Sequence, residues 1–153
     1  MVASALSRMS RNNSTVRGRL WRASNPTLDA AYANIGLTEL AQGRQAEAEA
    51  TFRKAIQAAP ASGAARLALA NFLWSVRRTQ EAEQAFKDAL ALNPADLAAN
   101  RALGMFYMSS ARTAEAEPYF KTIAQNARTT DAAINLADYY IVRRRQLAVA
   151  DLY

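Results

Sequence analysis

The chain has 153 residues and contains no histidine and no cysteine. These two absences exclude disulfides, thiol nucleophiles, imidazole bases and the common zinc sites. Five glycines and four prolines are too few for a loop-rich fold. No run of about 18 apolar residues is present that could form a transmembrane helix. With 51% hydrophobic and 21% charged residues, the composition is that of a folded protein. We therefore expect no enzyme activity and no cofactor, but a protein that binds or organises others.

The net charge of +6 comes almost entirely from the N-terminal end of the chain. Residues 1–28 contain five arginines and no acidic residue, whereas residues 29–153 contain fourteen basic and thirteen acidic ones. A nearly neutral body argues against a phosphate-binding surface, and hence against nucleic acid as the main partner.

The basic leader, residues 1–28, is predicted to be disordered or partly helical because of its composition. An organellar transit peptide and a basic arm that contacts an acidic partner, such as RNA or a membrane surface, are the alternatives. Its apolar run, Val2–Leu6, is too short for a secretory signal, and the sequence holds no cysteine for a lipoprotein anchor. The compartment is left open.

The body of the chain repeats itself every 34 residues. A fixed interval at several positions indicates that one structural unit has been duplicated. The in-phase positions are Gly36, Ala70 and Gly104; Ala48, Ala82 and Ala116; Phe52, Phe86 and Phe120; and Pro26, Pro60 and Pro94.

Each repeat is predicted to be a pair of antiparallel helices. In the first repeat, apolar residues recur at helical intervals over 29–42 and again over 45–58. Gly43 separates the two segments, since glycine adopts a left-handed conformation cheaply, and Pro60 ends the second one. A single pair of helices of about 21 Å cannot bury its apolar stripe, so the pairs must stack.

This pattern resembles the tetratricopeptide repeat family. The resemblance covers residues 29–128 and continues into a partial repeat. It implies an all-α fold, a right-handed α-solenoid of helix–turn–helix repeats whose first helices line a concave surface. After the leader we assign repeat 1 to 29–62, repeat 2 to 63–96, repeat 3 to 97–129 and a truncated repeat 4 to 130–153.

The C-terminal segment is predicted to stop within a repeat. The arginines at 143–145 are expected to follow a helix end, with a basic patch as the alternative, and Leu147–Tyr153 is expected to begin a further helix. We therefore expect the chain to be a fragment of a longer protein, and its uncapped apolar end to favour self-association.

Acidic and basic residues spaced four apart recur in the second helices. They form the pairs Glu49–Arg53, Glu83–Lys87 and Glu117–Lys121. Each pair stabilises a helix by about 0.2–0.5 kcal/mol, and the series is predicted to mark a solvated outer face.

A second stripe of the first helices is largely apolar, although the repeat motif does not require it. We predict that it forms a groove for a peptide or an amphipathic helix of a protein partner, with Trp74 as the anchor. The alternatives are that these residues pack against the protein's own helices, or that the segment is a spacer that binds nothing. The candidate residues are Leu37, Leu40, Leu67, Asn71, Trp74, Arg101, Met105 and Met108.

One ligand class of the family is not expected here. Members that clasp the C-terminal carboxylate of a chaperone tail present a lysine and an asparagine four residues apart on a first helix. In this sequence Ala33 and Leu37 occupy those positions. The resemblance therefore does not extend to that ligand.

Overall fold

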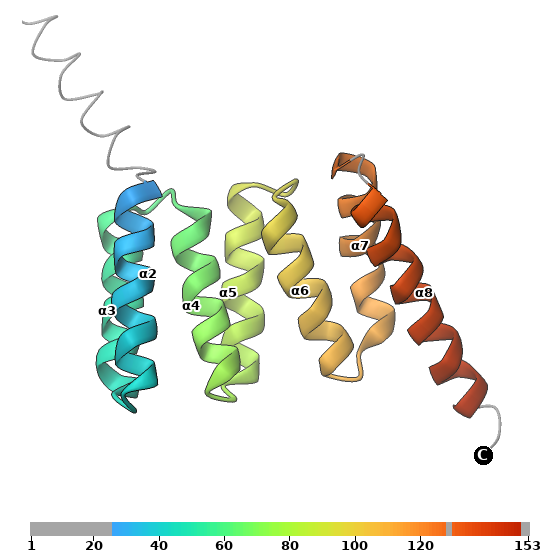
Figure 1. The fold of residues 1–153 in the computed structure, drawn as a ribbon, viewed down its shortest axis with the longest axis horizontal. Helices are drawn as coiled ribbons and strands as arrows, with labels where there is room; N and C mark the ends of the chain where they lie inside the picture. The colour runs from blue at the N-terminus through green and yellow to red at the C-terminus, as the bar shows by residue number, and fades with distance from the viewer. Residues whose placement is uncertain (1–25, 128–129, 151–153) are drawn as a thin grey trace, which may run out of the picture. The chain divides into compact units, whose positions relative to one another are not determined.

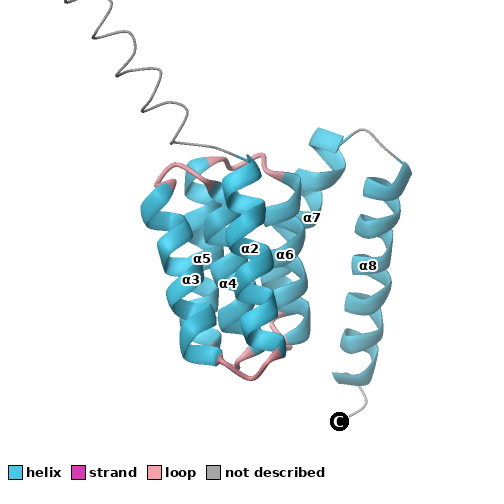
Figure 2. Ribbon diagram, turned by 60° about the vertical axis from the view of Figure 1, so that its left-hand side comes forward, coloured by secondary structure: helices cyan, strands magenta, loops and turns pink. Residues whose placement is uncertain are grey.

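The computed structural model describes residues 26–127 and 130–150, with side chains described for 28–127 and 134–147. These residues form seven α-helices and no strand (Figures 1 and 2), which confirms the all-α prediction. Most of the predicted leader lies outside the described residues. The helices are α2 (Pro26–Ala41), α3 (Gln45–Ala58), α4 (Gly63–Ser75), α5 (Thr79–Leu92), α6 (Leu97–Ser109), α7 (Thr113–Ala127) and α8 (Thr130–Ala150).

The chain divides within α4 into two compact units, residues 1–69 and 70–153. In the N-terminal unit α2 packs against α3. The contact depends on a small residue, because a Cβ atom added to Gly36 would lie 2.6 Å from Cζ of Phe52. Phe52 and Ala48 are fully buried. The periodic Gly and Phe of the sequence thus form the contact between the two helices.

In the C-terminal unit α6 packs against α5 and α7, and α7 packs against α8 (Figure 1). Gly104 repeats the arrangement seen at Gly36, since a Cβ atom there would lie 3.0 Å from the Phe120 ring. Phe86, Leu103, Phe106 and Phe120 are buried. The same pairing of a small residue with an aromatic ring therefore closes both helix pairs.

Three turns between paired helices share one backbone conformation. Gly43, Arg77 and Ala111 all have positive φ, at 76°, 66° and 58°. In the first turn the Arg44 N–H donates to the Glu39 carbonyl at 2.9 Å, a six-residue closure typical of helix C-termini. Gly43 was predicted for this conformation, whereas an arginine and an alanine adopt it at the other two turns.

The predicted helix end near the arginines at 143–145 is wrong. Helix α8 continues without a break from Thr130 to Ala150. No glycine or proline occurs in this stretch, and arginine, glutamine and leucine are good helix formers, so nothing stops the helix. Residues 151–153, part of the further helix predicted there, lie outside the described residues.

Helix α8 exposes several large apolar side chains. Ile134 and Ile141 are each 51% exposed, and Leu147 is 58% exposed. Self-association through this end stays a prediction. Neither α8 nor any other helix of the described residues is long and apolar enough to cross a membrane.

Candidate functional site

Five of the predicted groove residues lie in the C-terminal unit, on α4 and α6. Asn71 and Arg101 are exposed, and Met105 is 52% exposed. Trp74 and Met108 are half-buried. We call these five residues the α4–α6 face. The rest of the described chain therefore leaves Asn71, Arg101 and Met105 exposed and covers Trp74 and Met108 in part.

Trp74 is held by two aromatic neighbours. Its ring meets Phe86 edge to face at 6.2 Å between centroids and Phe106 at 5.8 Å. Phe86 and Phe106 are fully buried, so they fix one side of the indole in the core. Edge-to-face pairs are favourable, and here they leave the rest of the half-buried Trp74 side chain open to solvent.

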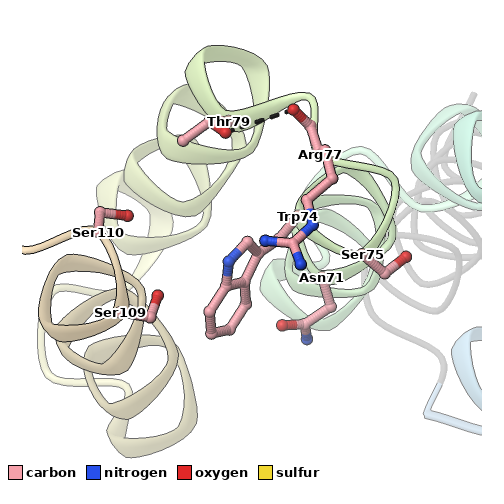
Figure 3. A pocket seen from close by; sticks show the side chains of 7 residues that line it. All are labelled: Asn71, Trp74, Ser75, Arg77, Thr79, Ser109 and Ser110. Atoms are coloured by element: carbon pink, nitrogen blue, oxygen red, sulfur yellow. Dashed lines mark hydrogen bonds between the residues drawn. The ribbon is translucent and has the colours of Figure 1, made fainter.

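A cleft of about 600 Å³ opens beside Trp74 (Figure 3). In the figure the indole extends from α4 toward Ser109 and Ser110 at the end of α6. The cleft includes Asn71 and Trp74 but not Arg101, Met105 or Met108, which follow along α6. It is lined by Asn71, Trp74, Ser75, Arg77, Thr79, Ser109 and Ser110.

Several hydroxyl groups in the cleft are already engaged. Ser75 Oγ donates to the Phe72 carbonyl at 2.6 Å, and Ser109 Oγ donates to the Phe106 carbonyl at 2.9 Å. The side chains of Asn71 and Arg77 make no hydrogen bond or ion pair with the described residues. These two side chains are therefore among the donors that the cleft could offer to a ligand.

Sequence reasoning did not identify Arg77 as part of the site. The available signal was its alignment, because Arg77 lies 34 residues after Gly43. An arginine at a turn position that favours glycine is a departure from the repeat, and such departures often have a functional reason.

The other three candidates lie in the N-terminal unit. Leu37 is 57% exposed on α2, while Leu40 on α2 and Leu67 on α4 are half-buried. Their part in a groove stays a prediction.

Two glutamates of the second helices, Glu83 and Glu117, bond residues of other helices in addition to the predicted i,i+4 partners. Glu83 accepts hydrogen bonds from Lys87 Nζ at 2.7 Å, from Tyr107 Oη at 2.8 Å and from Arg112. The Glu83 side chain is only 16% exposed. It therefore ties α5 to α6 and to the turn that follows α6, which the i,i+4 spacing alone did not indicate.

The surroundings of Glu83 lower its pKa. Hydrogen bonding from Arg112 is the main cause, and Lys87 and Tyr107 add to it against the opposing effect of burial, so the pKa is about 2. Glu117 repeats the arrangement, since it accepts hydrogen bonds from Tyr140 at 3.2 Å and from Arg143 on α8. Hydrogen bonding from Lys121 is the main cause that lowers the pKa of Glu117.

A second cleft, of about 360 Å³, lies beside α5 and α7. Its lining residues are Lys87, Leu90, Ala91, Pro94, Asn100, Pro118, Tyr119 and Thr122. We call it the α5–α7 cleft. In the part of the chain that the structure describes, no three carboxylates are grouped to hold a metal ion.

Two sequence profiles described as tetratricopeptide repeat match this chain. One matches residues 73–138 and the other residues 29–62, together about two thirds of the sequence. No curated protein matches the sequence.

Among the solved structures that are similar in fold are three tetratricopeptide repeat structures. The first tetratricopeptide repeat domain of human RPAP3 has a TM-score of 0.63 at 18% identity, over 81% of this chain and 98% of that one. The first such domain of Spaghetti (RPAP3), bound to the HSP90 peptide SRMEEVD, has a TM-score of 0.63 at 17% identity. The match covers 79% of this chain and 99% of that one. A tetratricopeptide repeat protein of Parabacteroides merdae has a TM-score of 0.63 at 21% identity. The match covers 90% of this chain and 54% of that one.

Proposed function

Because the chain belongs to the tetratricopeptide repeat family, we propose that it recognises a protein partner by holding a peptide or an amphipathic helix on the α4–α6 face. The exposure of Met105 on α6, whose Phe106 contacts the half-buried Trp74, carries this proposal. Interfaces owe most of their affinity to a few aromatic anchors in well-packed surroundings. Methionine adds an adaptable apolar surface next to such an anchor.

Further features support a peptide rather than a small molecule. The apolar surface continues along α6 from Met105 to Met108, outside the cleft itself. An extended ligand could therefore lie along α6 while one of its side chains enters the cleft. The related domain of Spaghetti (RPAP3) shows that a fold of this kind can hold a short peptide.

The ligand is not expected to be the chaperone tail that this relative binds. Ala33 and Leu37 stand where a lysine and an asparagine would be needed to hold a C-terminal carboxylate. Leu37 instead offers an exposed apolar side chain, and with Leu40 and Leu67 it would form a separate apolar surface of the N-terminal unit. A spacer that binds nothing is the competing function.

The experiment is a selection from a displayed library of random peptides. The wild-type chain is expected to enrich peptides, and the double variant Trp74→Ala, Met105→Ala should bind the selected peptides at least about tenfold more weakly. The matched control is Leu92→Ala, Leu147→Ala, which removes two exposed leucines from other helices and should bind like the wild type. Circular dichroism checks that all three chains are equally helical.

Two results would contradict the proposal. If the wild type enriches no peptide, the spacer function is favoured. If the Trp74 and Met105 variant binds the selected peptides as tightly as the wild type does, the α4–α6 face is not the binding site.

A further inference from the structure

The turn after α4 has an arginine, Arg77, at the position where the turn after α2 has Gly43. Gly43 and Arg77 hold the same left-handed conformation, at φ of 76° and 66°. This conformation is easy for glycine and costly for a residue with a Cβ atom. Arg77 therefore places a charged side chain at a strained turn position where the first repeat has glycine.

Arg77 also differs from the arginines at the neighbouring turn positions. Arg78 bonds Glu81 at 2.6 Å, and Arg112 bonds both Glu115 and Glu83. Arg77, in contrast, forms no ion pair with any described residue, and the cleft lining contains no acidic side chain. Figure 3 shows the Arg77 side chain extending from the turn over the α4 side of the cleft, which Asn71 and Trp74 also line.

This combination favours an anionic ligand group next to an apolar one. A guanidinium binds the oxygens of a carboxylate or a phosphate with paired hydrogen bonds. The Asn71 amide can donate to a backbone carbonyl or accept from a backbone N–H of a peptide. Trp74 offers an apolar surface to the neighbouring side chain. A volume of about 600 Å³ is large enough for a few peptide side chains.

We propose that the cleft is a specificity subsite for an anionic side chain of the partner peptide, held by Arg77, with an apolar side chain of the peptide packed on Trp74. The inference rests on the proposed function, because it names the ligand chemistry of the same face. The anionic group is the carboxylate of aspartate or glutamate, or the phosphate of a phosphorylated serine. Both groups present at least two anionic oxygens that can accept hydrogen bonds from a guanidinium.

The first test compares the composition of the selected peptides. Wild-type chain should enrich peptides with an aspartate or glutamate at a fixed distance from an apolar residue. The variant Arg77→Gly should select peptides without this acidic preference. The matched control is Ala111→Gly, which makes the same backbone change at the equivalent turn without loss of charge. It should keep the wild-type preference.

The second test measures one selected peptide in three synthetic forms, with glutamate, glutamine or phosphoserine at the preferred position. On the wild type, the change from glutamate to glutamine should weaken binding about three- to tenfold, and high salt should reduce that difference. On Arg77→Gly the glutamate and glutamine peptides should bind within about twofold of each other. The phosphoserine form shows which anion the subsite prefers.

The outcomes separate this inference from the proposed function. If the wild type selects peptides that bind through Trp74 but carry no acidic preference, the subsite is overturned and the proposed function stands. The subsite is also overturned if the change from glutamate to glutamine in the peptide weakens its binding equally to the wild type and to Arg77→Gly. If no peptide is enriched at all, the proposed function fails.

Discussion

The two sides of helix α6 differ in how they use the repeat. On the packing side, Leu103, Gly104 and Tyr107 are buried, and each has an apolar or small counterpart 34 residues earlier. On the α4–α6 face, Arg101 and Met105 are exposed. The residues 34 positions before them, Leu67 and Asn71, have a different chemistry.

The difference separates the residues that stabilise the fold from those proposed to bind a partner. Several positions that hold helix against helix keep their residue type in the three repeats, as Phe52, Phe86 and Phe120 do, because a close helix contact accepts few sizes. The exposed positions of the α4–α6 face vary, since stacking of the helices places no demand on them. Substitutions on the packing side should therefore affect unfolding, and those on the α4–α6 face should affect binding.

The largest expected effect is on the packing side. Phe120 is 4% exposed and lies against Gly104 and Tyr139. Phe120→Ala should lower the free energy of unfolding by about 3–5 kcal/mol, because it leaves a cavity between α6, α7 and α8. Met105→Ala, on the exposed side of α6, should change it by less than about 0.5 kcal/mol. Urea unfolding followed by circular dichroism measures both, and equal losses would erase the distinction between the two sides.

The hydrogen bonds of Glu83 should have a smaller effect. Glu83→Gln should lower the free energy of unfolding by about 1–2 kcal/mol at neutral pH, since charged hydrogen bonds to Arg112 and Lys87 become neutral ones. Glu47→Gln serves as the control. Glu47 is exposed and makes no polar contact with other described residues, so its replacement should have little effect.

The contribution of Glu83 should also depend on pH. Its pKa falls from 4.5 to about 2 on folding, so the folded state holds the ionised form more tightly than the unfolded state does. The stabilisation is present above pH 4.5 and is lost as the pH falls toward 2. The gap in stability between the wild type and Glu83→Gln should shrink over this range. A constant gap down to pH 2 would show that Glu83 is not the titrating group.

The smallest effect is expected at the turns. Ala111→Gly should raise the free energy of unfolding, and Gly43→Ala should lower it, each by about 1 kcal/mol. The reason is the positive φ that both residues adopt. The midpoints of urea unfolding should rise for Ala111→Gly and fall for Gly43→Ala. A lower stability of Ala111→Gly would mean that the left-handed conformation carries no strain at Ala111.

Much of the fold could be predicted from the sequence because its signals are local and repeated. Gly43 marks a turn through its own backbone preference, and Phe52 and Phe120 mark buried positions through their period. The extent of α8 could not be found in the same way. A helix end near residues 143–145 was predicted from the repeat length, but the sequence there has no residue that ends a helix.

The site was predicted only in part. Trp74 and Asn71 follow from helical periodicity, which places them on one face of α4. Ser109 is the last residue of α6, and Arg77 and Ser110 lie just beyond the ends of α4 and α6, so the turn geometry decides whether they reach the same cleft. The contacts of Glu83 with Tyr107 and Arg112 likewise join residues 24 and 29 positions apart, which no local pattern indicates.

The most direct test of the account locates a selected peptide on the wild-type chain by NMR. Amide chemical shifts of the free and bound protein are compared residue by residue. We expect the largest changes at Asn71, Trp74 and Met105, together with the Trp74 indole N–H. Changes centred instead on Leu90, Tyr119 and Thr122, in the α5–α7 cleft, would contradict recognition by the α4–α6 face.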